Sequence, residues 1–143
     1  MIPNKVIVHH SLTKDSETVS WGAIRKYHVE TLGWRDIGYH AGVELTRSGD
    51  NLYYETLLGR DWDDTGAHTK GQNESSLGIC FVGNWDIQEP PGDMLIVGAR
   101  VIRMCLRLFG IKPSEVYGHK DFADKSCPGL LFSTNKLRFL IGE

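Results

Sequence analysis

The chain has 143 residues, of which 41% are hydrophobic and 24% are charged, and its formal net charge is −2. This length fits one compact domain whose core needs no disulfide bonds, and the composition excludes a disordered chain. The small negative charge excludes a general electrostatic attraction to nucleic acid or to an anionic membrane. We therefore expect one domain over residues 1–143, a monomer with no nucleic-acid or membrane partner.

The N-terminal third opens with a predicted strand followed by a predicted helix. The β-branched run over residues 5–9 (KVIVH) indicates a buried strand. Ser20 is a suitable N-cap for a helix that continues to about Leu32, and Gly33 is expected to end it. The residues expected on one face of this helix are Trp21, Ile24 and Tyr27.

The middle of the chain is rich in strand signals. Two strands are predicted over residues 39–46 and 51–55, on either side of a Ser-Gly-Asp turn at residues 48–50. The run LGICFV at residues 77–82 is apolar almost throughout, which is typical of a central strand buried on both faces.

The C-terminal half begins with the longest predicted helix, capped by Asp93, continuing to Phe109 and ended by Gly110. Residues 115–118 are expected to form a short strand, and residues 133–141 a terminal helix. The apolar residues that recur at helical spacing in the long helix are Met94, Val97, Val101, Met104 and Leu108. Together these elements predict an α/β fold in which helices pack on one mixed central sheet.

The beginning of the chain carries no secretory signal. Its first residues, Met-Ile-Pro-Asn-Lys-Val, lack the charged segment and the apolar run that such a signal needs. No stretch reaches the roughly 18 apolar residues of a membrane span. We therefore expect a protein that is made in the cytoplasm without a signal peptide.

A candidate metal site lies in the loop-rich segment GHKDFADKSCPG at residues 118–129, where His119 precedes Cys127 by eight positions. Thiolate and imidazole are ligands that zinc prefers, although this spacing is too long for a zinc knuckle. Two local ligands and one distant histidine would leave the open coordination position of a catalytic zinc. The alternative is that Cys127 is simply a small buried hydrophobic residue.

The third ligand is not determined by the pattern of the first strand. His9 and His10 follow each other at its end, and side chains alternate across a strand, so only one of them can face a given site. Both faces of this strand are expected to be buried, so periodicity does not choose between the two histidines. The same ambiguity separates Tyr39 from His40.

Six short blocks, in this order, resemble those of the zinc-dependent N-acetylmuramoyl-L-alanine amidases, whose fold is shared with peptidoglycan recognition proteins. One block alone is weak, but six in the same order over nearly the whole chain are highly specific. The likeness is greatest to short phage endolysins that consist of the catalytic domain alone. The blocks are VHHS (8–11), GWRDIGYH (33–40), GRDW (59–62), GAHTKGQN (66–73), SLGICFVG (76–83) and GHKDFADKSCPG (118–129).

The resemblance implies roles for individual residues. It places one zinc ion per chain on His9, His119 and Cys127, and it makes Tyr39 and Lys125 the catalytic residues. It also places His68 in the substrate groove, where Trp62 and Trp85 are further candidates for the walls, although Trp85 fits core packing equally well. The remaining histidines are expected to be structural: His10, His28 and His40.

The chain departs from the family's pattern in two respects. One branch of the family has a proton-transfer glutamate where this chain has Cys80, which we interpret as a packed core residue. The paired cysteines of animal recognition proteins are missing, which argues against a secreted immune receptor.

The implied activity is hydrolysis of the amide bond between N-acetylmuramic acid and L-alanine in peptidoglycan, by a phage or prophage endolysin that acts on the cell wall after release. Lys125 and Tyr39 would stabilise the oxyanion, with their roles not divided. Two rivals remain, a peptidoglycan-binding module without turnover and a cysteine hydrolase that uses Cys127 with His119. Some phage amidases of this type also bind an RNA polymerase, which nothing in the sequence tests.

Overall fold

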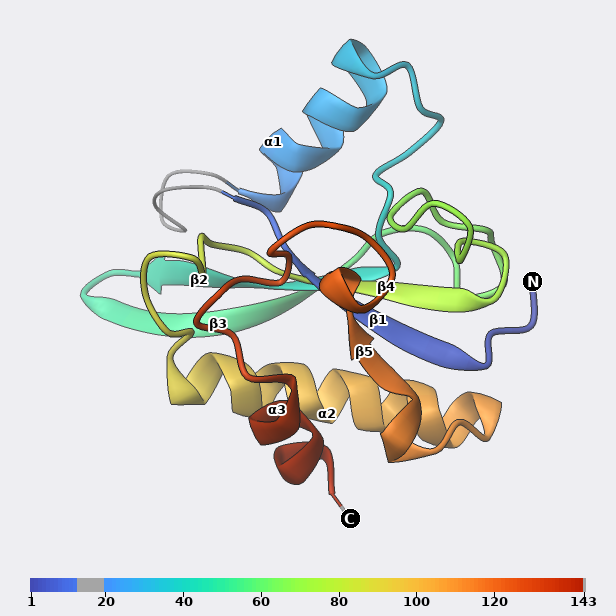
Figure 1. The fold of residues 1–143 in the computed structure, drawn as a ribbon. Helices are drawn as coiled ribbons and strands as arrows, with labels where there is room; N and C mark the ends of the chain where they lie inside the picture. Colours follow the sequence, from blue (N-terminus) through green and yellow to red (C-terminus); the bar gives the residue numbers. More distant parts are fainter. Residues whose placement is uncertain (13–19, 143) are drawn as a thin grey trace.

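One mixed β-sheet runs through the computed structural model, which describes residues 1–12 and 20–142 (Figure 1). Within these residues the sheet has five strands in the order β3-β2-β4-β1-β5. The β2–β3 pair is antiparallel, and the other neighbouring pairs are parallel. The strands are β1 (Lys5–His10), β2 (Ala41–Ser48), β3 (Asn51–Leu58), β4 (Ser76–Phe81) and β5 (Val116–Gly118). The predicted α/β fold with a mixed central sheet is thereby confirmed.

The two faces of the sheet are covered by different helices. α1 (Trp21–Lys26) lies on one face, and α2 (Gly92–Phe109) and α3 (Thr134–Ile141) lie on the other (Figure 1). Because side chains alternate along a strand, the face under α2 and α3 receives the aliphatic residues Val6, Val8, Leu77 and Ile79. The face under α1 receives the intervening residues, among them His9 and Cys80.

The long helix α2 has nearly the predicted length, but its N-cap and its buried stripe differ from the prediction. It begins at Gly92 after Pro91, so Asp93 is not the cap but lies in the first turn, where a carboxylate favours the positive end of the helix dipole. It ends at Gly110, whose φ of +66° is the left-handed conformation predicted there. The buried stripe is rotated by about one residue from the predicted one, since Met104 and Leu108 are exposed. The buried residues are Met94, Leu95, Gly98, Ala99, Val101, Ile102, Cys105 and Leu106.

The first helix is capped by the Ser20 side chain, as predicted, but it changes character after Lys26. The chain continues as a π-helical turn, η1 (Tyr27–Thr31), before Gly33. Tyr27 is 54% exposed, so its predicted place on the buried face is wrong. His28 is buried instead, because it follows Trp21 by seven residues, which is about two helical turns.

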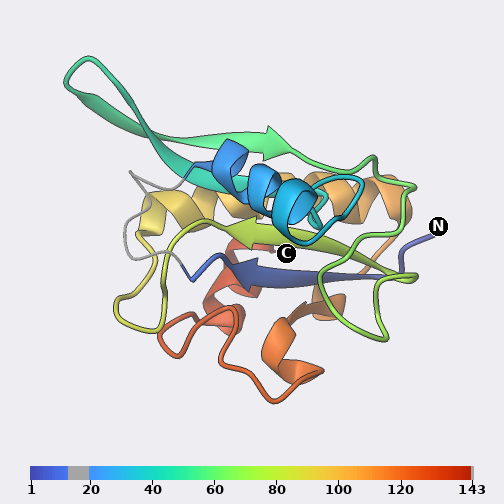
Figure 2. The same cartoon turned by 90° about the horizontal axis from the view of Figure 1, so that it is seen from above.

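The hairpin of β2 and β3 turns at Gly49, as predicted, and extends away from the rest of the molecule (Figure 2). β2 begins at Ala41, two residues later than predicted, so Tyr39 and His40 precede the strand. This leaves Tyr39 in the loop that approaches the carboxyl end of β1. In the described residues, no helix has both the length and the apolar character needed to cross a membrane.

Candidate metal centre

His9, His119 and Cys127 meet at one end of the central sheet. His9 lies near the end of β1, and His119 directly follows β5, whose Gly118 pairs with Val8 in parallel register. All three side chains are buried, and their candidate ligand atoms lie within 4.8 Å of one another. Among residues 1–12 and 20–142 this is the one group of three such side chains placed to hold a metal ion. The structure thus brings together the three residues predicted as ligands.

The choice between His9 and His10 follows from the pleat of β1. His9 shares the α1 side of the sheet with Cys80, its partner in the β4 register. His10 faces the opposite side, where its Nδ1 accepts a hydrogen bond of 3.2 Å from the backbone N–H of Trp85. Only His9 can therefore join the metal group.

The segment that carries Cys127 is fixed by hydrogen bonds at several points. The backbone N–H of Lys120 donates to the carbonyl of Cys127 at 2.7 Å. The Asp86 carboxylate accepts from the Ser126 hydroxyl at 3.0 Å and from the backbone N–H of Leu130 at 2.9 Å. Because these bonds hold both flanks of Cys127, its sulfur is held in place before any metal binds.

His9 is also oriented by neighbours on its far side. Its Nδ1 lies 3.6 Å from the sulfur of Cys127, whereas its Nε2 lies 3.0 Å from Nδ1 of His68 and 3.3 Å from the Thr69 hydroxyl. A Cβ atom at Gly78 would lie 2.5 Å from the His68 ring, so only glycine at that position admits the ring. If Nδ1 of His9 binds a metal, Nε2 carries the proton and donates it to His68.

Burial controls the protonation of this group. It lowers the pKa of His9 well below the ordinary value, and it lowers the pKa of His68 to about 3. The pKa of His119 is lowered by burial and by the charge of Lys125. Burial raises the pKa of Cys127 to about 11. At neutral pH the imidazoles are therefore neutral and ready to bind a cation, whereas the thiol must lose its proton when a metal binds.

The two residues predicted as catalytic lie beside the metal group. The ring of Tyr39 is 5.2 Å from the ring of His9, measured between centroids. Burial raises the pKa of Tyr39 well above the ordinary value, so the hydroxyl keeps its proton. Lys125 lies in the same segment as Cys127, and its side chain lines a cleft together with His68 and His119.

The cleft beside the metal group has a volume of about 570 Å³, and a second cavity elsewhere in the molecule has about 580 Å³, so volume alone does not identify the site. The cleft beside the metal group includes Trp34, Lys70 and Phe122, which sequence reasoning did not single out. Each of the three lies within or next to a block of the resemblance, which was the available signal. Its full lining is Trp34, Ala67, His68, Thr69, Lys70, Gly71, Asn73, His119, Phe122, Ala123 and Lys125.

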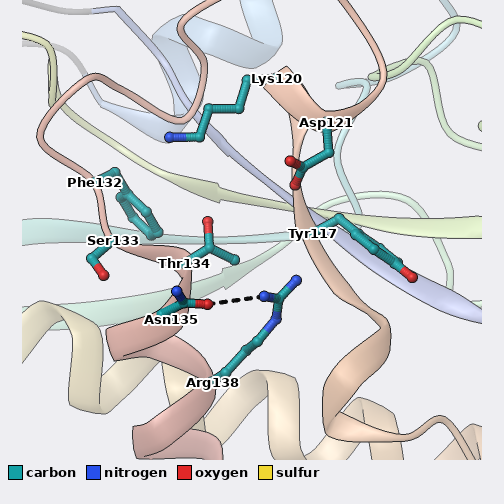
Figure 3. A pocket seen from close by; sticks show the side chains of 8 residues that line it. All are labelled: Tyr117, Lys120, Asp121, Phe132, Ser133, Thr134, Asn135 and Arg138. Carbon is teal, nitrogen blue, oxygen red and sulfur yellow. Dashed lines mark hydrogen bonds between the residues drawn. The ribbon is translucent and has the colours of Figure 1, made fainter.

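The second cavity lies between β5 and the start of α3 (Figure 3). Its main cation, Arg138, is engaged: it donates to the carbonyl of Val116 and to the side chain of Asn135, and it lies over the Tyr117 ring. None of the residues predicted as ligands or catalytic groups lines this cavity. The chemistry of the lining residues therefore assigns the site to the cleft beside the metal group.

The other candidates for the groove lie elsewhere. Trp62 stacks on His40, with ring centroids 6.5 Å apart, and does not line the cleft, so its contact with substrate stays a prediction. Trp85 is 2% exposed and donates its indole N–H to the carbonyl of Phe81, which makes it a core residue.

The remaining histidines are structural, as expected. Nδ1 of His28 accepts a hydrogen bond from the backbone N–H of Gly38, and Nδ1 of His40 accepts one from Gly78. The first bond holds the loop at Gly38, and the second holds Gly78 of β4, and both are buried. These imidazoles therefore shape the backbone around the metal group without joining it.

A buried set of two histidines and one cysteine, one of which (His119) lines a cleft, is the arrangement of a metal-dependent hydrolase domain. The model of the N-acetylmuramoyl-L-alanine amidase family matches residues 1–130. The chain belongs to this family.

Known relatives include both enzymes of phages and recognition proteins of animals. The endolysin of Klebsiella phage KP32 is 32% identical over 131 residues, which are 87% of this chain and 80% of that protein. Peptidoglycan-recognition protein SC1a of Drosophila melanogaster is also 32% identical, over 86% of this chain; the match spans 66% of that longer protein. Among solved structures, the endolysin amidase LysCS from Clostridium intestinale is similar with a TM-score of 0.78 at 25% identity, over 97% of this chain and 83% of the other.

Proposed function

We propose that this chain is a zinc-dependent amidase that hydrolyses the bond between N-acetylmuramic acid and L-alanine in peptidoglycan. The observation that carries the proposal is the convergence of His9, His119 and Cys127 beside an open cleft. Membership of the amidase family and the similarity to phage endolysins support the reaction and the substrate class. By the same reasoning the protein acts as an endolysin, on the cell wall, after its release from the cell in which it is made.

The donor set fits one zinc ion per chain. Thiolate and imidazole are preferred zinc ligands, and three protein ligands leave one coordination position for water or substrate. When bound, zinc would lower the pKa of a water molecule toward about 7 and polarise the carbonyl of the scissile amide. His68 would keep the His9 ring in the orientation that turns Nδ1 toward the metal.

Two side chains would stabilise the transition state. The Lys125 ammonium lies on the cleft side of the metal group, where it can attract the negative charge that develops on the substrate carbonyl oxygen. The protonated Tyr39 hydroxyl can donate a hydrogen bond to the same oxygen, because its raised pKa keeps the proton available. Neither group needs to bind the metal to act in this way.

The cleft suits a muramyl peptide. Trp34 and Phe122 offer aromatic surfaces to the apolar faces of a sugar or of alanine, and Lys70 and Lys125 offer cations to the carboxylates of the peptide stem. No Asp or Glu lines this cleft among the described residues, so no negatively charged side chain of the lining would repel an anionic stem.

The decisive experiment combines metal analysis with product analysis on purified peptidoglycan. We expect about one zinc per chain, new alanine amino groups during digestion, no new reducing sugar ends, and loss of turnover to a chelator that zinc reverses. Full activity in metal-free protein would instead favour a cysteine hydrolase that uses Cys127. Zinc binding without any cleavage would favour a recognition module.

A further inference from the structure

The loop between β3 and β4 carries two residues that contact the candidate ligand His9. Nε2 of His9 lies 3.0 Å from Nδ1 of His68 and 3.3 Å from the Thr69 hydroxyl. The two residues also contact each other, at 3.1 Å between Nδ1 of His68 and the Thr69 hydroxyl. The orientation of the His9 ring therefore depends on how this loop is held.

One side-chain oxygen in the same loop holds both of these residues. Oδ1 of Asn73 accepts a hydrogen bond of 2.8 Å from the backbone N–H of His68 and another of 2.8 Å from that of Thr69. Because both residues are buried, a backbone N–H that lost its acceptor there would be costly. The two donors also determine the orientation of the Asn73 amide, since only its oxygen can accept.

A tight turn brings the Asn73 side chain back over the two N–H groups. The backbone N–H of Gln72 donates to the carbonyl of Thr69 at 2.9 Å, and Gly71 has a φ of +82°, a left-handed conformation that favours glycine. The Ser76 hydroxyl, at the start of β4, donates to the carbonyl of Gln72 at 2.7 Å. The turn is therefore anchored to the central sheet.

We infer that Asn73 is a positioning residue of the metal site, an inference that rests on the zinc site proposed for this chain. Asn73 fixes His68 and Thr69, and these two residues fix the ring of His9. It acts on the metal ligand through them and needs no contact with the metal. A neutral acceptor suits a residue that lines the cleft, because a carboxylate there would repel the carboxylates of the peptide stem.

The test is the zinc affinity of Asn73 variants, measured by competition with a chelator in the absence of substrate. Asn73→Ala leaves His68 and Thr69 without their acceptor, so zinc affinity should fall by roughly 10-fold, the lower end for residues that orient metal ligands. Asn73→Asp keeps an oxygen that accepts from both N–H groups and should stay within about 3-fold of the wild type. Asn135→Ala is the matched control on α3, where Oδ1 accepts from Arg138, and it should keep the wild-type affinity.

Two further comparisons separate positioning from loop stability and from charge. In a His68→Ala, Thr69→Val background the side chains that hold His9 are already gone, so adding Asn73→Ala should leave zinc affinity unchanged. Gln72→Glu added to Asn73→Ala places a carboxylate one residue away, without the two hydrogen bonds, and should not restore the affinity. Thermal unfolding of the metal-free proteins measures the stability of each variant separately from zinc binding.

Three results would overturn the inference alone. These are wild-type zinc affinity in Asn73→Ala, an equal fall in affinity with and without the side chains of His68 and Thr69, and a rescue by Gln72→Glu equal to that by Asn73→Asp. If Asn73→Ala does not fold, Asn73→Ser takes its place in every comparison, because its shorter side chain cannot reach both N–H groups.

Failure of the proposed function gives different results. A wild-type protein that binds no zinc would overturn the proposed metal site, and with it the role of Asn73. Zinc binding without cleavage of peptidoglycan would overturn the amidase activity alone, because the affinities of the Asn73 variants are measured without substrate.

Discussion

The two faces of the central sheet contain buried side chains of different kinds. Under α2 and α3, the strands present aliphatic residues such as Val6, Val8 and Ile79, which pack into one large cluster. Under α1, the same strands present His9, Cys80 and the glycine Gly78, whose missing side chain admits the His68 ring. One face is built to pack, and the other is built to hold polar groups at fixed distances.

The comparison shows how one short strand serves both purposes. His9 and His10 are adjacent, yet one joins the candidate metal group and the other bonds to the backbone of Trp85. The aliphatic face fixes the register of β1, because a slip by one residue would move every side chain to the opposite face. The position of the metal group is therefore determined by packing on the face that carries no site.

Exchanging one buried cysteine on each face is expected to give the largest difference in zinc content and turnover between two variants. Cys127→Ser removes a candidate zinc ligand, so we expect loss of bound zinc and of detectable turnover. Cys105→Ser, the matched exchange on the buried side of α2, places a hydroxyl in an apolar cluster and should lower the unfolding temperature while zinc and kcat persist. Zinc content, thermal unfolding and turnover on both proteins test this. Retention of zinc by the Cys127 variant would contradict the assigned ligand set.

The next largest effect is expected where the site face meets the cleft. Tyr39→Phe and Lys125→Ala each remove one group near the developing oxyanion, so kcat should fall by on the order of 10²–10³. Both should keep zinc, and KM should change less than kcat because the lost interactions strengthen in the transition state. Tyr27→Phe and Lys120→Ala are matched controls outside the cleft lining. If both catalytic variants cleave at the wild-type rate, the proposed mechanism is wrong.

Sequence reasoning predicted the parts of the molecule that depend on local pattern. The Ser20 cap and the Gly110 helix end follow from neighbouring residue types, and both are observed. The central strand predicted at residues 77–82 is also observed, one residue earlier, as β4 (Ser76–Phe81). The buried stripe of α2 was placed about one residue wrong, because two apolar stripes overlap on that helix and only the sheet decides between them.

Some residues of the candidate site could likewise be predicted, and others could not. The resemblance identified the three residues that the structure brings together, but the pattern of β1 alone could not choose His9 over His10. The contact from His68 to His9 was not predictable, because it joins a loop and a strand far apart in the chain. The place of Trp34 and Lys70 in the cleft lining was not predictable for the same reason.

Truncation of a side chain in the aliphatic cluster should affect stability without affecting the metal site. Ile102 is fully buried in the α2 cluster, so Ile102→Ala should lower the free energy of unfolding by about 2–5 kcal/mol. Zinc content and kcat measured below the unfolding temperature should stay unchanged, because the site face keeps all its contacts. Denaturant unfolding and turnover assays measure the two quantities. A large fall in kcat of the folded variant would show that the two faces are not separable.

The smallest effect is expected at His68, which lies on the site face but outside the ligand set. His68→Ala removes the acceptor 3.0 Å from Nε2 of His9, so the His9 ring loses one of the partners that fix its orientation. Substitutions of this kind weaken metal affinity by roughly 10- to 100-fold, and we expect zinc affinity to fall within that range. Because Thr69 also contacts Nε2 of His9, the loss should be incomplete, and a Thr69→Val exchange added to His68→Ala should deepen it. Competition with a zinc chelator measures the affinity, and kcat at saturating zinc should recover far more than in the Tyr39 or Lys125 variants. Unchanged zinc affinity together with a raised KM would show that His68 serves the substrate and not the ligand.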